Sequence, residues 1–202
     1  MTKPRAKDRA ETRRLTRPQK TSPLRATPRT VTTLARRRVT TTGKAPDVVH
    51  PNAELIDRFY TAFNAYDAET MAGSYTDDAA FEDPAFGQLT ADEVRDMWRM
   101  LLGRATDLRA EYRDIRADDQ TGAAHWEAYY TFNGHPVHNV IDATFAFTDR
   151  RISRHVDVFD WPRWAGQALG LPGKLLGRTS FLHARAQASA RKQLETYRAG
   201  QV

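Results

Sequence analysis

A short acidic segment, AFEDP at residues 80–84, decides how the rest of this chain is interpreted. Two helix-like segments precede it, a third follows it, and its apolar start predicts a short buried strand over residues 79–83. Side chains alternate between the two faces of a strand, so either Glu82 or Asp83 points inward if the other points to solvent. Pro84 ends the strand and biases Asp83 toward an extended backbone.

Asp83 is a candidate general base. A carboxylate that faces an apolar interior has its charged form disfavoured, which raises its pKa toward the range that is useful for proton transfer. The competing interpretation is a solvated acidic turn. An isolated Glu-Asp-Pro is more typical of such a turn than of a buried base.

Helical spacing of apolar residues predicts three helices around this strand. The first starts near Asn52, which can cap it, and the second covers residues 68–75 after a cap at Asp67. Thr90 and Glu93 form a capping box in front of the third helix. The apolar positions are Leu55, Ile56, Phe59, Phe63 and Tyr66 in the first helix, and Val94, Met97, Trp98, Leu101 and Leu102 in the third.

Strand-like runs joined by turn residues follow these helices. The layout predicts an α+β fold in which a cone-shaped, curved antiparallel sheet wraps over three N-terminal helices and leaves a mouth for a small ligand. The runs cover residues 108–117, 123–132, 137–148 and 152–160.

A C-terminal helical extension is expected after the last strand. Residues 161–169 look helical, Leu171-Pro172-Gly173 is expected to break the helix, and residues 179–198 form a basic amphipathic helix. This extension, residues 171–202, is a candidate lid, dimer contact or membrane-surface helix. Its apolar face is sparse, which favours packing on its own domain.

Charge is spread unevenly along the chain, whose net charge is +6. Residues 1–47 carry +11, residues 48–170 carry −10 and residues 171–202 carry +5. The composition of residues 1–47 predicts a disordered basic tail that could touch nucleic acid or anionic lipid weakly. A transit peptide, or translation that starts later at Val31 or Val39, are the alternatives. An inert tail or a later start is favoured over a binding arm.

Composition excludes several classes of protein. The 202 residues hold no cysteine, so disulfides, thiolate metal sites and cysteine nucleophiles are excluded. No apolar run approaches the roughly 18–20 residues needed to cross a bilayer, and a secretory signal is not evident, so a cytoplasmic protein without a transmembrane segment is expected. His135 and His138 have no third ligand at metal spacing, so neither a metal nor another cofactor is expected.

Three stretches carry a resemblance to a known family: residues 58–67 (RFYTAFNAYD), residues 81–84 (FEDP) and residues 155–160 (HVDVFD). Their order and spacing resemble the SnoaL-like branch of the nuclear-transport-factor-2-like superfamily, which includes ketosteroid isomerases and polyketide cyclases. The resemblance covers about residues 52–170 and implies a SnoaL-like domain over residues 48–170. It also implies an apolar pocket, a homodimer and no metal.

The resemblance to ketosteroid isomerases implies roles for individual residues. Asp83 matches their base aspartate. Their oxyanion tyrosine falls at Phe59, which cannot donate a hydrogen bond, and Tyr60 lies about 100° further round the helix. Their oxyanion aspartate falls near Asp142, which fits only with a one-residue bulge. Without the bulge, alternation puts Asp142 on the face opposite Asn139.

The resemblance to polyketide cyclases implies a second acid. Their acid–base aspartate lies on the last long strand, which points to Asp157. His155 and Phe159 share its face, so a His155–Asp157 pair is expected inside the mouth, with a surface pair as the alternative. Trp98 and Trp126 are expected as core or pocket wall. Tyr129 and Asn139 are candidate hydrogen-bond donors to a ligand oxygen, with exposed strand positions as the equal alternative.

The expected function is proton transfer on a small, apolar or aromatic carbonyl compound by isomerisation, aldol-type cyclisation or hydration, with Asp83 or Asp157 as the base. The alternative is a non-catalytic binding module for a hydrophobic ligand. A third possibility is nucleic-acid association through the basic tail.

Overall fold

The structure is a computed structural model that describes residues 49–201. The predicted disordered tail of residues 1–47 therefore lies outside the described residues.

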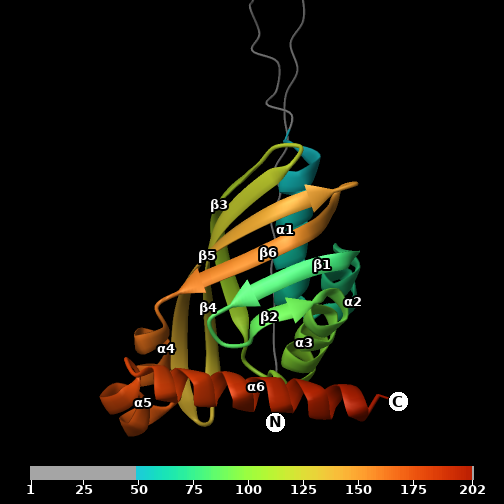
Figure 1. Cartoon of the computed structure of the whole chain (residues 1–202). Coiled ribbons are helices and arrows are strands. Elements are labelled where there is room, and N and C mark those ends of the chain that lie inside the picture. The colour runs from blue at the N-terminus through green and yellow to red at the C-terminus, as the bar shows by residue number, and fades with distance from the viewer. Residues whose placement is uncertain (1–48, 202) are drawn as a thin grey trace, which may run out of the picture. The chain divides into compact units, whose positions relative to one another are not determined.

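A six-stranded, curved and unclosed sheet forms the centre of the domain, in the order β2-β1-β6-β5-β4-β3 (Figure 1). The sequence-based prediction of an α+β cone is confirmed. The strands are β1 (Tyr75–Asp83), β2 (Gly87–Thr90), β3 (Arg109–Ala117), β4 (Thr121–Phe132), β5 (His135–Thr148) and β6 (Arg151–Phe159).

One strand pair departs from the predicted antiparallel sheet. Strands β3 to β6 form the expected antiparallel meander, whereas β1 pairs with β6 in parallel. No hairpin connects β1 to β6, because β2, a helix and the rest of the meander lie between them, so turn chemistry does not set their relative direction. The short strand β2, which pairs with β1, was not predicted.

Three helices supply the layer against the sheet: α1 (Pro51–Asn64), α2 (Ala68–Gly73) and α3 (Ala91–Arg104). The capping box of Thr90 and Glu93 is present. The predicted cap Asn52 is wrong: His50 caps α1, because Pro51 takes the first helical position, and the Asn52 amide instead donates to the carbonyl of Asp118 at 2.8 Å. Helix α2 ends at Gly73, two residues before the predicted end, because Tyr75 already belongs to β1.

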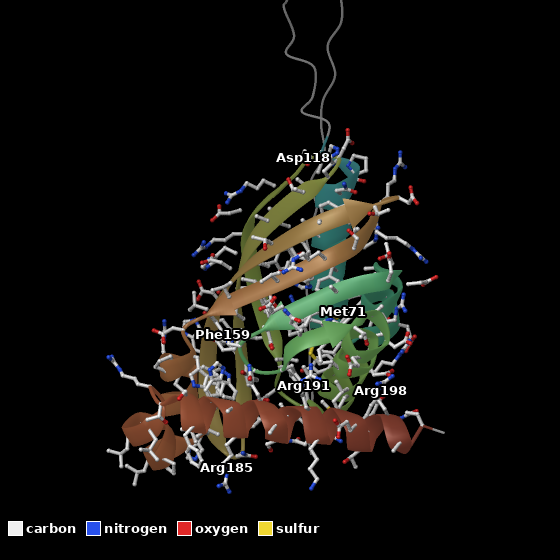
Figure 2. The ribbon with its side chains drawn as sticks, in the orientation of Figure 1. Met71, Asp118, Phe159, Arg185, Arg191 and Arg198 are labelled. Carbon is white, nitrogen blue, oxygen red and sulfur yellow. The ribbon has the colours of Figure 1, made fainter. Side chains whose placement is uncertain are left out.

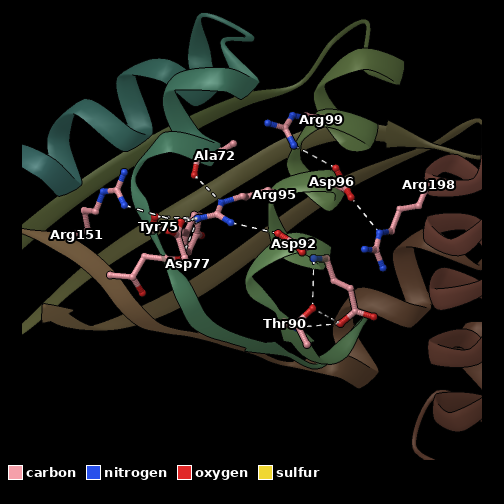
Figure 3. A network of polar contacts seen from close by, with 12 residues as sticks. Ala72, Tyr75, Asp77, Thr90, Asp92, Arg95, Asp96, Arg99, Arg151 and Arg198 are labelled. Atoms are coloured by element: carbon pink, nitrogen blue, oxygen red, sulfur yellow. Dashed lines mark hydrogen bonds and ion pairs between the residues drawn. The ribbon is translucent and has the colours of Figure 1, made fainter. Parts of the chain in front are cut away.

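Arg95 of α3 holds the start of β1 in place (Figure 3). Its guanidinium donates hydrogen bonds to the carbonyls of Ala72, Tyr75 and Thr76 at 3.3, 3.1 and 2.9 Å. Its side chain is only 17% exposed, and it also pairs with Asp77 at 2.9 Å. Three backbone acceptors at the junction of α2 and β1 therefore depend on one side chain.

We expect Arg95→Met to lower the free energy of unfolding by about 1–3 kcal/mol, because partly buried carbonyls lose their donor. Arg99→Met is the matched control on the same helix. Arg99 bonds only to the carboxylates of Glu69 and Asp96, so its loss is expected to cost about 0–1 kcal/mol. Urea unfolding of both variants is the measurement, and equal losses would contradict this assignment.

The C-terminal extension forms α4 (Trp161–Ala168), α5 (Gly170–Leu176) and α6 (Ser180–Ala199). The predicted break at Leu171-Pro172-Gly173 is wrong. The chain turns one residue earlier, at Gly170, whose φ of +64° suits glycine, and Pro172 sits in the first turn of α5, where its missing N–H is not needed.

Helix α6 packs back on its own domain. Leu194 is buried, Arg198 pairs with Asp96 of α3 at 3.0 Å, and Arg191 donates to the carbonyl of Phe86 at 3.0 Å. Both arginines reach from α6 toward the rest of the domain (Figure 2). Within residues 49–201, no helix has the length and apolar character needed to cross a membrane.

Candidate functional site

A cavity of about 560 Å³ lies between the inner face of the sheet and helices α3, α4 and α6. This volume is in the usual range of small-molecule sites. Two acids, Asp83 and Asp157, line it together with an aromatic wall. The wall includes Phe63, Trp98, Trp126, Phe159, Trp161 and Trp164.

Strand pairing brings the two acids to the same place. In the parallel pair of β1 and β6, Phe81 is aligned with His155. Asp83 and Asp157 each lie two residues further along their strands, and residues two apart share a face of the sheet. Both carboxylates therefore reach the cavity at the same end of the sheet.

Asp83 is half-buried at the end of β1, where its Oδ1 accepts the backbone N–H of Phe86. Burial raises the pKa of Asp83 from 3.8 to about 7, the backbone N–H bond opposes this, and the nearby carboxylate of Asp157 adds to the rise. Glu82 takes the other face and lies 3.4 Å from Arg154. Near neutral pH, Asp83 is thus present in both its protonated and ionised forms.

This raised pKa predicts a pH-dependent difference in stability. The folded state holds the Asp83 proton more tightly than the unfolded chain, so protonation stabilises the fold fully below pH 3.8, and this contribution is lost as the pH rises to about 7. Relative to Asp83→Asn, which cannot ionise, the wild type should lose about 1–4 kcal/mol over that interval.

Urea unfolding at a series of pH values measures this difference. Glu82→Gln is the matched control, since Glu82 faces outward beside Arg154. A constant difference in stability between wild type and Asp83→Asn from pH 4 to pH 8 would show that Asp83 titrates as an ordinary carboxylate.

Asp157 ends a buried chain of hydrogen bonds. Its Oδ1 lies 3.1 Å from Nε2 of His155 and accepts the indole N–H of Trp126 at 3.3 Å. Nδ1 of His155 lies 2.8 Å from the hydroxyl of Tyr75, which accepts the indole N–H of Trp98 at 3.0 Å. An unbroken series of side-chain hydrogen bonds therefore runs from Trp98 through Tyr75 and His155 to the carboxylate of Asp157.

His155 lies deeper than predicted. It is fully buried behind Asp157, with its ring 4.4 Å from Phe145 and 5.1 Å from Phe81 between ring centroids. The expectation that it lies inside the mouth is wrong. Strand β6 lies between β1 and β5 in the sheet, and the only residues of β6 that line the cavity are Asp157 and Phe159 at its end. His155 can act on a ligand only through Asp157.

The expectation that Phe59 and Tyr60 line the pocket is also wrong. Both are buried in the core between α1 and the sheet. Phe59 packs edge-on against Trp98 and His155, each 5.7 Å away between ring centroids. Tyr60 stacks on Tyr112 at 5.1 Å, and its hydroxyl has no hydrogen-bond partner among residues 49–201. Of the residues on α1, the cavity reaches Phe63, one turn after Phe59, but neither Phe59 nor Tyr60.

Asp142 lies on the outer face of the sheet, so its predicted place at the pocket is wrong. It is exposed, and its carboxylate accepts a hydrogen bond from Nδ1 of His125 at 2.8 Å. Strand β5 is regular here, with Asp142 paired to Val158, so the required bulge is absent at this position and alternation decides the face. Asn139, on the inner face of the same strand, does line the cavity.

Tyr130 is a cavity residue that sequence reasoning missed. Its hydroxyl oxygen accepts the indole N–H of Trp164 at 2.7 Å, and burial raises its pKa to about 12. It therefore stays protonated and can donate to a ligand. The sequence did offer a signal for this position. Tyr130 lies two residues after Ala128 and four after Trp126 on β4, so all three side chains share one face of the strand.

Helices α4 and α6 close the cavity with residues for which the sequence analysis gave no pocket role, among them Trp161, Trp164, Leu182, Ala186 and Ala190. Across residues 49–201, the structure places no group of three or more His, Asp or Glu side chains that could hold a metal ion.

Comparison with known proteins agrees with this fold. Residues 56–155 match the family described as SnoaL-like domain. No curated protein matches the chain. The solved structures described below are less than 25% identical to the chain and therefore bear on the fold alone.

Three of these solved structures illustrate the likeness. An LEH-like epoxide hydrolase from M. tuberculosis is 19% identical with a TM-score of 0.52, over 62% of this chain and 93% of its own. IdmH, a proposed polyketide cyclase from Streptomyces antibioticus, is 21% identical with a TM-score of 0.51, over 60% and 100%. A hypothetical protein with a ketosteroid isomerase-like fold from Catenulispora acidiphila is 12% identical with a TM-score of 0.53, over 60% and 95%.

Proposed function

The chain carries a SnoaL-like domain, and we propose that it is an enzyme that moves a proton within a small, largely apolar carbonyl compound. The observation that carries this proposal is that two acids in different environments, Asp83 and Asp157, line one aromatic cavity. A carboxyl group whose pKa is raised by burial, and which lines a cavity beside a second acid, is typical of acid–base sites.

Asp83 is the proposed base that takes a proton from the carbon next to the carbonyl group. Its pKa of about 7 leaves an ionised fraction at neutral pH and makes the carboxylate a stronger base than an ordinary aspartate. The backbone N–H of Phe86 fixes one of its oxygens and leaves the other for the substrate.

Asp157 is the proposed second acid–base group, which returns a proton at the other end of the reacting unit. Its Oδ1 is occupied by His155 and Trp126, so Oδ2 is the oxygen that is available to a ligand. The buried Tyr75–His155 pair holds the carboxylate in one orientation, which makes both positioning residues.

Tyr130 and Asn139 are proposed to stabilise the enolate. Both line the cavity, and both carry donors that can reach a ligand oxygen as negative charge develops on it. They take the place of the hydroxyl that α1 does not supply.

Solvent exchange tests the reaction class without a known product. A panel of cyclic ketones, enones and hydroxylated aromatic ketones is incubated with the enzyme in D₂O, and deuterium uptake next to the carbonyl is followed by NMR. We expect uptake with the wild type that Asp83→Asn lacks. Uptake that both Asp83→Asn and Asp157→Asn retain in full would refute proton transfer by these acids.

A non-catalytic binding module is the second candidate, because α1 contributes no hydrogen-bond donor to the cavity and Phe59 is buried in the core. Native mass spectrometry of the purified protein separates the two functions. A copurified hydrophobic ligand that is never converted favours the binding module.

The homodimer, the cytoplasmic location and weak contact of residues 1–47 with nucleic acid stay predictions. For the dimer we propose the outer face of β5 and β6, where Asp142, Thr144 and Val158 are exposed. Sedimentation equilibrium measures the association.

A further inference from the structure

Helix α5 packs on α4 through its glycines instead of its leucines. A Cβ at Gly173 would lie 1.8 Å from the carbonyl oxygen of Ala165, so the two helices approach as closely as their backbones allow. Gly177 lies one turn further along the same side. Leu171 and Leu175, also one turn apart, lie on the opposite side and take no part in this packing.

The leucines that α5 leaves outside are unusually exposed. Leu171, Leu175 and Phe181 are 73%, 79% and 69% exposed, and Leu176 is 46% exposed. We call these four residues the corner patch. The three leucines lie on α5, and Phe181 lies in the first turn of α6, which begins shortly after α5 ends. Clustered apolar exposure of this kind marks an interaction site, whereas single exposed apolar residues do not.

Positive charge surrounds the corner patch. Residues 161–194 contain six Lys and Arg and no Asp or Glu. Lys174, Arg178 and Arg185 alternate with the apolar residues along the chain, are exposed, and form no ion pair within residues 49–201. Exposed apolar residues interspersed with cations are complementary to a surface that is apolar inside and anionic outside.

We propose that the corner patch docks the protein on an anionic lipid surface. Leu171, Leu175 and Phe181 enter the boundary between headgroups and acyl chains, while Lys174 and Arg178 contact lipid phosphates. A second copy of the chain is a poorer occupant, because a symmetric contact would bring the same cations face to face. A lipid surface also accepts a short apolar corner without a groove of matching shape, which a second copy of the chain would have to provide.

The corner patch is continuous with the cavity wall. Phe181 is followed directly on α6 by Leu182, and Leu182 and Ala186 line the cavity. Docking through the corner patch would thus place the cavity beside the phase in which an apolar compound concentrates. This inference does not depend on the proposed proton transfer.

Vesicle cosedimentation tests the docking. We expect the wild type to bind vesicles of phosphatidylcholine mixed with phosphatidylglycerol, and to bind phosphatidylcholine alone far more weakly. The double change Leu171→Ser and Leu175→Ser should weaken binding about tenfold or more. The double change Lys174→Glu and Arg178→Glu should weaken it about tenfold or more as well, and added salt should weaken wild-type binding.

Matched controls are Val49→Ser, which removes another exposed apolar side chain, and Arg58→Glu, which reverses an exposed charge on α1. Both should leave vesicle binding unchanged, and circular dichroism confirms that every variant is folded.

Three outcomes would overturn the proposal. The first is a wild type that binds no mixed vesicle at low salt. The second is binding that survives both double changes, which would assign it to another part of the chain such as residues 1–47. The third is a corner-patch variant that dissolves a dimer while the wild type ignores vesicles, which would make a second copy the occupant.

Discussion

Replacing Asp83 with Asn is expected to lower kcat/KM by about 10²–10⁴-fold, the usual contribution of a positioned general base. Asn keeps the shape and can still accept the N–H of Phe86, so the turn at residues 83–86 should survive. It cannot take a proton from carbon. The variant should therefore bind substrate and fold, yet fail in the chemical step.

The pH profile identifies Asp83 as the group responsible. If Asp83 is the base, kcat/KM of the wild type should rise with pH and level off above about 7, the pKa that burial gives this carboxylate. Residual activity of Asp83→Asn should lack this rise. Glu82→Gln, which changes the neighbouring outward carboxylate, should keep both the rate and the profile. A profile that is the same in wild type and Asp83→Asn would remove Asp83 from the mechanism.

Replacing Asp157 with Asn is expected to lower kcat/KM by about 10²–10⁴-fold as well. The amide oxygen of Asn can still accept from His155 and Trp126, so the buried hydrogen bonds should persist. Asp142→Asn is the matched control on the neighbouring strand, because Asp142 faces outward beside His125. Equal activity in Asp157→Asn and Asp142→Asn would rule out a catalytic role for Asp157.

Tyr75→Phe separates positioning from chemistry at the same acid. It removes the hydrogen-bond partner of Nδ1 of His155, so the imidazole loses an orienting contact and holds Asp157 less firmly. We expect a smaller loss in kcat/KM than in Asp157→Asn, about tenfold, with KM nearly unchanged. Asp157→Asn combined with Tyr75→Phe should then be no slower than Asp157→Asn alone, as measured by steady-state kinetics.

Much of the fold could be read from local patterns. Helical spacing around Phe59 and Phe63, the capping box at Thr90 and the turns between β3 and β6 all act between residues close in sequence. Alternation along a strand predicted that Asp83 and Glu82 take opposite faces and that Asp157 shares a face with His155 and Phe159. It equally indicated the outer position of Asp142, which only an extra bulge would have changed.

The depth and partners of each side chain could not be read in this way. Phe59 and Tyr60 were expected at the pocket because the oxyanion tyrosine of ketosteroid isomerases falls at Phe59, yet packing between α1 and the sheet buries both side chains in the core. Tyr75 was assigned to the end of a helix, whereas its hydroxyl orients His155 from the start of β1. A place for α6 over the pocket was one of the alternatives that its sequence left open, and the residues that line the cavity could not be read from it.

The amino-acid order by itself determined most of the helices and strands, their order along the chain, and that Glu82 and Asp83 take opposite faces, because backbone geometry repeats every two residues in a strand and every 3.6 in a helix. Only the tertiary structure decided that β1 lies parallel to β6, which sets Asp83 and Asp157 at one cavity and removes them from bulk water. That pairing joins strands far apart in the chain, and it is chosen by the burial of apolar surface across the whole domain, which no local pattern records.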